Sequence, residues 1–155
     1  MQIVNAREYF MAARDAAEAV ATYDARLARE REKCGLRARS LEPSCHGSFL
    51  DAMRHADRVV DMEEARPREL RDAEQIVRDA VLVLAGVSSV HPRWCQVVGL
   101  RFLARLRWDA VANRVGMTRA EAEAACDACL DWVDSEGIAR VREMQIAREG
   151  VTSAT

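Results

Sequence analysis

Residues that end helices and form tight turns are scarce in this chain of 155 residues. It contains seven glycines and three prolines, and the stretches between them repeat apolar residues at intervals of three or four. Because β-turns draw heavily on glycine and proline, such a chain offers little material for a sheet of many strands. Alanine, leucine, glutamate and arginine are frequent and favour helices. We therefore predict an all-α fold of five or six helices and exclude all-β folds.

A stripe of residues with heptad spacing runs through the N-terminal segment. Alternating steps of four and three residues connect Tyr9, Ala13, Ala16, Val20, Tyr23, Leu27, Glu30 and Cys34. This spacing predicts one long helix over residues 5–33, with the stripe along one face. The stripe can pack on other helices of the same chain, or on a second copy as a coiled coil. On the second alternative, we predict a homo-oligomer formed through residues 9–34.

Turn-forming residues divide the chain into an arm, a compact domain and a tail. Residues 35–48 hold two glycines, one proline and three serines, which predicts a loop within a helical arm over residues 1–86. Pro67 predicts a kink or a new helix start. The Gly-Val-Ser-Ser-Val sequence of residues 86–90 predicts a short connection. The compact domain is then expected over residues 90–148, with residues 149–155 as a disordered tail.

Residues 108–125 have the spacing of two short helices that cross at a tight turn. Ala112 offers the small side chain that a steep crossing needs, and Gly116 tolerates the positive φ of the turn. Thr118 and Glu121, three residues apart, predict a capping box at the start of the second helix. The inner face of both helices is apolar, through Val111, Val115, Met117, Ala122 and Ala125. This spacing is typical of a helix-turn-helix, whose second helix enters the major groove of DNA. A helical hairpin without a role in DNA binding is the alternative.

The stretch from Cys95 to Thr118 resembles region 4 of bacterial sigma-70-type factors. The residues that match are Leu100-Arg-Phe-Leu103, Trp108, Val111, Ala112, Val115, Gly116 and Thr118. The order of a long N-terminal helix, a Ser/Gly/Pro loop and a second helical arm also resembles a family of small phage-encoded transcription regulators with such a domain. The resemblance implies sequence-specific binding of double-stranded DNA in the regulation of phage or prophage genes, alongside host RNA polymerase.

The charges around this motif are uneven. Residues 91–118 carry five arginines and one aspartate, a net charge of +4, whereas residues 119–155 carry four arginines and eight acidic residues. Phosphate contacts by basic residues supply much of the affinity for DNA, and a glutamate can accept a hydrogen bond from cytosine. We predict phosphate contacts from Arg105, Arg107 and Arg114, and base or phosphate contacts from Arg119. The full set of candidate DNA-binding residues is Arg105, Arg107, Arg114, Thr118, Arg119, Glu121 and Glu123.

The acidic second helix departs from the sigma-like pattern, in which this helix is rich in basic and amide side chains. Acidic side chains near phosphates are repulsive, so this helix is a poor electrostatic match for DNA on its own. Two alternatives follow. The chain can be a non-enzymatic interaction module that binds RNA polymerase or another protein through this acidic helix, or a phage DNA-packaging subunit.

The sequence gives only weak indications of a metal site or a catalytic site. Cys126 and Cys129, together with His91 and Cys95, could supply four zinc ligands, but these positions also fall on apolar helix faces, where cysteine serves as a small core residue. No glycine-rich phosphate loop, nucleophile elbow or pair of cleft carboxylates is present. We therefore expect no enzyme activity, no metal and no cofactor. The lack of an apolar run long enough to span a membrane and the odd number of cysteines predict a cytoplasmic protein.

Overall fold

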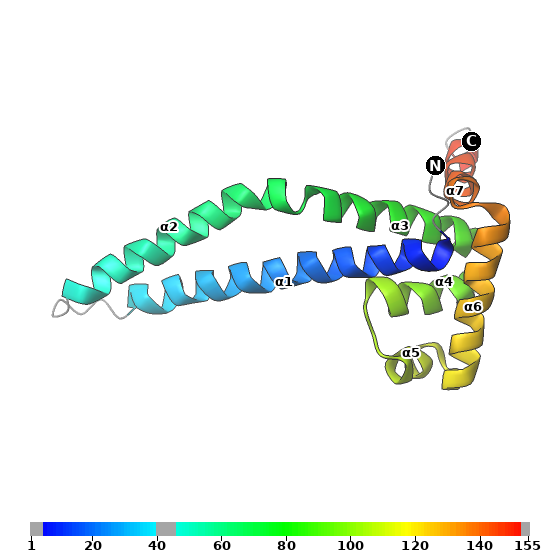
Figure 1. Ribbon diagram of the computed structural model, residues 1–155, viewed down its shortest axis with the longest axis horizontal. Coiled ribbons are helices and arrows are strands. Elements are labelled where there is room, and N and C mark those ends of the chain that lie inside the picture. The colour runs from blue at the N-terminus through cyan, green and yellow to red at the C-terminus, as the bar shows by residue number, and fades with distance from the viewer. Residues whose placement is uncertain (1–4, 40–45, 153–155) are drawn as a thin grey trace. The chain divides into compact units, whose positions relative to one another are not determined.

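The computed structural model describes residues 5–39 and 46–152, and those residues are almost entirely helical (Figure 1). No strand occurs among them, which confirms the all-α prediction. The described part holds seven α-helices and one π-helix, more than the five or six helices predicted. In chain order they are α1 (Ala6–Arg39), α2 (His46–Glu69), α3 (Arg71–Val90), α4 (Pro92–Val98), the π-helix η1 (Gly99–Leu103), α5 (Trp108–Val115), α6 (Arg119–Glu136) and α7 (Ile138–Thr152).

The helices group into two compact units. The first contains Met1–Glu18 and Glu74–Thr155, and the second contains Ala19–Ala73, so α1 contributes to both. This grouping differs from the predicted arm over residues 1–86 and domain over residues 90–148. The reason is burial: apolar side chains in the first turns of α1 and along α3 belong to the same core as those of the C-terminal helices.

The first turns of α1 are fixed to the core and to α6. The rings of Phe10 and Phe102 lie 5.8 Å apart between their centroids, and both side chains are buried. The side chain of Asp134 accepts a hydrogen bond of 2.6 Å from the backbone N–H of Ala6. Arg7 forms an ion pair of 2.6 Å with Asp127. The N-terminal end of α1 is therefore held by two carboxylates of α6.

A glycine within α3 allows α3 and α7 to touch through their backbones. A Cβ atom on Gly86 would lie 1.9 Å from the backbone oxygen of Val141, closer than any real contact. The prediction of a connection at residues 86–90 is therefore wrong, because α3 continues through Gly86 to Val90. Gly86 therefore allows two helices to approach each other closely and does not form a turn.

The second unit is a pair of helices formed by the later part of α1 and by α2. Leu27 and Met62 are buried there, and the Tyr23 hydroxyl donates a hydrogen bond to the carbonyl oxygen of Met62. Two ion pairs connect the same helices, Arg31 with Glu63 at 2.5 Å and Arg66 with Asp24 at 2.9 Å.

The heptad stripe of α1 is largely covered within one chain. Ala13 and Ala16 are buried in the first unit, and Leu27 and Glu30 are buried in the second. These positions thus pack on the chain's own helices, as in the first of the two alternatives. The homo-oligomer through residues 9–34 stays a prediction.

Three segment boundaries differ from those predicted. The loop at residues 35–48 is shorter, because α1 runs through Gly35 to Arg39 and α2 begins at His46; residues 40–45 lie outside the described part. A single glycine costs a helix about 1 kcal/mol, which good helix formers on both sides can offset. α2 runs past Pro67, and the break falls at Leu70. In the predicted tail, residues 149–152 are helical as the end of α7, and residues 153–155 are not described.

Candidate nucleic-acid interface

α5, a tight turn and α6 follow the local design expected from the sequence (Figure 1). Gly116 ends α5 in the left-handed conformation, with φ +67° and ψ +39°. The hydroxyl of Thr118 accepts a hydrogen bond of 3.2 Å from the backbone N–H of Glu121, and the Glu121 carboxylate accepts one of 2.8 Å from the backbone N–H of Thr118. The predicted capping box is therefore confirmed, and α6 begins at Arg119.

The inner face of this hairpin is apolar, as predicted. Val111 and Ala122 are fully buried, and Ala112 is 5% exposed. The remaining predicted members, Val115, Met117 and Ala125, are half-buried and pack against the same core. The small side chain of Ala112 thus lies where α5 meets the core.

The predicted phosphate-binding arginines are placed differently from one another. Arg107, immediately before α5, and Arg114, in its last turn, are exposed. Arg105 is half-buried and has a positive φ of 58°.

Arg101, in η1, holds the chain segment between η1 and α5. Its Nη1 donates a hydrogen bond of 2.9 Å to the carbonyl oxygen of Leu106. Its Cζ lies 4.9 Å from the centroid of the Trp108 ring, within the range of a cation–π interaction. Burial lowers the pKa of Arg101, and the positive charges of Arg14 and Arg119 lower it further. Arg101 is thus a fixed cation close to other cations.

The carboxylates of α6 that were predicted to contact DNA, on Glu121 and Glu123, have partners within the chain. The carboxylate of Glu121 completes the capping box, and the two hydrogen bonds from Thr118 lower its pKa. Glu123 forms an ion pair of 2.8 Å with Arg119, whose Nη1 also lies 3.7 Å from Asp109 of α5. Together with Asp127 and Asp134, which bind the start of α1, these residues account for most of the acidic character of α6.

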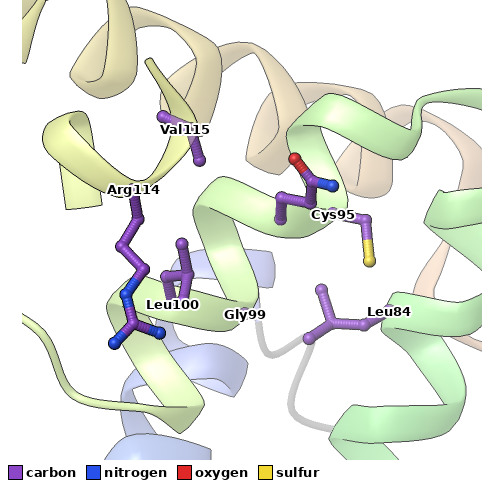
Figure 2. A pocket seen from close by; sticks show the side chains of 7 residues that line it. Leu84, Cys95, Gly99, Leu100, Arg114 and Val115 are labelled. Atoms are coloured by element: carbon purple, nitrogen blue, oxygen red, sulfur yellow. The ribbon is translucent and has the colours of Figure 1, made fainter. Parts of the chain in front are cut away.

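Two cavities adjoin the hairpin. The larger, of about 410 Å³, is mainly apolar; Figure 2 shows the sulfur of Cys95 near Leu84 on one side and the guanidinium of Arg114 beside Leu100 on the other. It is lined by Leu84, Cys95, Gln96, Gly99, Leu100, Arg114 and Val115.

The second cavity, of about 310 Å³, is strongly basic. It is lined by Arg14, Arg101, Arg107, Trp108, Asp109 and Arg119. Arg14 is not among the residues predicted from the sequence, because it lies far from the motif along the chain. The one available signal was its position directly after Ala13 of the buried stripe, at the edge of the face that packs on the core.

Two cysteines of α6 behave as core residues. Cys126 and Cys129 are buried, and burial raises the pKa of their thiols to about 11 and about 12. Metal ligation needs thiolates, which this environment disfavours. Among the described side chains within residues 5–39 and 46–152, no group of three or more His, Cys, Asp or Glu is arranged to hold a metal ion. Nor is any helix in these ranges long and apolar enough to cross a bilayer.

The chain matches no family model, no curated protein and no solved structure.

Proposed function

We propose that this protein binds double-stranded DNA through the α5–α6 hairpin, as a sequence-specific transcription regulator of phage or prophage genes. The observation that supports it most is the position of two arginines. Arg119, the first residue of α6, reaches Asp109 in the first turn of α5, and Arg107 directly precedes α5. Both therefore lie at the end of the hairpin where a recognition helix would approach bases and phosphates. The resemblance of residues 95–118 to sigma region 4 points the same way.

The acidic composition of α6 is a weaker objection to this proposal than it is in the sequence alone. Carboxylates that cap a helix or pair with arginines contribute less repulsion toward phosphate than free ones, because opposite charges a few ångströms apart largely cancel at a distance. Glu121, Glu123 and Asp127 are all engaged in this way. Thr118 and Glu121 are both candidate DNA contacts, but their side chains already form the capping box at the start of α6.

The alternative of an interaction module that uses the acidic helix loses support for the same reason. Asp131 is exposed, and no residue in the described ranges pairs with it, but it stands alone as a binding feature. Nothing in the described residues favours a packaging subunit. In our proposal the protein works in the cytoplasm without a cofactor, alongside host RNA polymerase.

Selection of bound fragments from a genomic library, followed by fluorescence anisotropy, tests the proposal. We expect one preferred sequence, with Arg119→Ala reducing the preference for it over random DNA by about 5- to 150-fold, the range for a lost bidentate base contact of about 1–3 kcal/mol. Glu123→Ala is the matched control, since it removes the same ion pair but keeps the arginine. If no fragment is enriched, or if Arg119→Ala and Glu123→Ala act alike, the proposal is wrong.

A further inference from the structure

The basic cavity brings together more positive charge than its carboxylates neutralise. Four arginines and one acidic residue line it, and the carboxylate of that acidic residue, Asp109, lies next to Arg119. Arg119 is also paired with Glu123. Arg14 and Arg107 form no ion pair with any residue that the structure describes. The cavity is therefore left with uncompensated cations from α1, from η1 and from the residue before α5.

Such an arrangement attracts an anion, because its cations outnumber the carboxylates that line the same space. Like charges that share a partly desolvated space repel one another, and the lowered pKa of Arg101 reflects both its burial and the neighbouring Arg14 and Arg119. An ordinary solvated surface would let flexible arginines separate. Here Arg101 cannot move away, because Leu106 and the Trp108 ring hold it.

The number of arginines around the cavity suits a phosphate group, which carries more negative charge and more acceptor oxygens than a carboxylate. Planar guanidinium groups match the oxygens of a phosphate through paired hydrogen bonds, and several can share one phosphate. A cavity of about 310 Å³ admits one phosphate group with room for the remainder of its ligand. The π-helical turn of η1 contains Arg101, and widened turns of this kind recur at functional sites.

We propose that this cavity binds one phosphate group, and that Arg14 of α1 is one of its ligands. The phosphate can belong to the DNA backbone, in which case the inference rests on the proposed function, or to a free phosphate or phosphomonoester. In either case α1 is part of the binding site, although it lies outside the helix-turn-helix-like segment.

Trp108 provides a built-in reporter for the free anion. It lines the cavity under Arg101, whereas Trp94 and Trp132 pack against His91. Inorganic phosphate added to the full chain at constant ionic strength should change tryptophan fluorescence saturably and raise the melting temperature. Arg14→Gln should weaken this response about tenfold, the effect of one lost charge-assisted contact. Arg140→Gln, an exposed arginine of α7, is the control and should respond like the parent.

The melting temperature of Arg14→Gln without phosphate distinguishes a folding defect from a loss of phosphate binding. Since Arg14→Gln removes a repelling charge, that temperature should stay equal or rise, and only the increase caused by phosphate should shrink. A fall without phosphate, together with an undiminished increase on phosphate addition, would contradict the proposed role of Arg14.

Anisotropy with a duplex separates the two sources of phosphate and separates this inference from the proposed function. If Arg14→Gln weakens binding to all duplexes and lowers the salt slope by about one, the DNA backbone supplies the phosphate. If inorganic phosphate binds through Arg14 but no duplex does, the cavity is a site for a free phosphate, and the proposed function fails alone. If Arg14→Gln and the parent bind both phosphate and duplex equally, the inference is overturned, whatever the outcome for DNA.

Discussion

Arg105 shows how a residue can be placed by backbone conformation rather than by its charge. It is the one residue other than glycine with a positive φ in the described ranges, at 58°. Backbone hydrogen bonds of 3.0 Å on either side of it, from Ala104 to Gly99 and from Leu106 to Leu100, close the end of η1. The predicted phosphate contact therefore coincides with a reversal of the chain before α5.

Replacing Arg105 with glycine should stabilise the protein. A side chain in the left-handed region costs about 1–2 kcal/mol, part of which glycine returns through the greater freedom of the unfolded chain. We expect Arg105→Gly to raise the free energy of unfolding by about 0.5–1 kcal/mol in urea titrations. Arg105→Ala keeps the strain and should show no such gain. A loss of stability in Arg105→Gly would mean that contacts of the arginine side chain outweigh the strain.

The buried thiols of α6 should be unreactive in the folded protein. Because burial raises the pKa of Cys126 to about 11 and that of Cys129 to about 12, both stay protonated at pH 8. Iodoacetamide at pH 8, followed by peptide mass spectrometry, should leave both unmodified in buffer and modify both in urea. Rapid labelling of either in buffer would show that this face of α6 opens readily.

At the scale of elements, two glycines in neighbouring helices should respond in opposite ways to the same substitution. Gly86→Ala places a methyl group against the Val141 backbone, whereas a Cβ on Gly99 would meet only the Leu84 side chain at 3.6 Å. We expect Gly86→Ala to lower the free energy of unfolding by about 1–3 kcal/mol or more, because the added methyl group overpacks the contact. Gly99→Ala should be neutral or gain up to about 1 kcal/mol from helix propensity. Equal effects in thermal melts would mean that α3 and α7 do not touch at Gly86.

The start of α6 should give the protein a pH-dependent stability in acid. Hydrogen bonds from Thr118 lower the folded-state pKa of Glu121 below its ordinary value of 4.5. The unfolded state therefore binds the proton more readily, so this stabilisation is present above the unfolded pKa and is lost as the pH falls through the folded pKa. Glu121→Gln should be less stable than the parent at pH 6, and the gap should narrow below about pH 4. A gap that does not change with pH would contradict a role for the charged carboxylate.

A structural feature could be predicted from the sequence when residues close together in the chain determine it. The left-handed Gly116, the Thr118–Glu121 capping box and the apolar face of the hairpin follow from neighbouring residues, and the sequence predicts them correctly. In the sequence, Gly86 cannot be told apart from a glycine that forms a turn. Only the structure shows that it allows the backbone of Val141 to approach closely. The position of Arg14 beside the hairpin likewise depends on how α1 packs, which no spacing within the motif reveals.

At the scale of the whole molecule, the arrangement of the chain explains why the division into arm and domain could not be predicted. The heptad stripe is continuous along α1, yet its first part is buried in the first unit and its later part in the second. A repeated pattern on one helix does not tell which partner covers it. As a result, α1 contributes Arg14 to the lining of the basic cavity in addition to its role in packing.

The salt dependence of DNA binding measures whether the hairpin binds DNA through its exposed arginines. Arg107 is exposed and without an ion pair in the described residues, so it is free to contact phosphate. Each lost phosphate contact lowers the slope of log K against log salt concentration by about one. We predict that the full chain binds duplex DNA at low salt, that Arg107→Gln lowers the slope by about one for every sequence, and that Arg140→Gln leaves it unchanged. Absence of duplex binding at low salt, or equal slopes for the parent, Arg107→Gln and Arg140→Gln, would show that the hairpin does not bind DNA through these arginines.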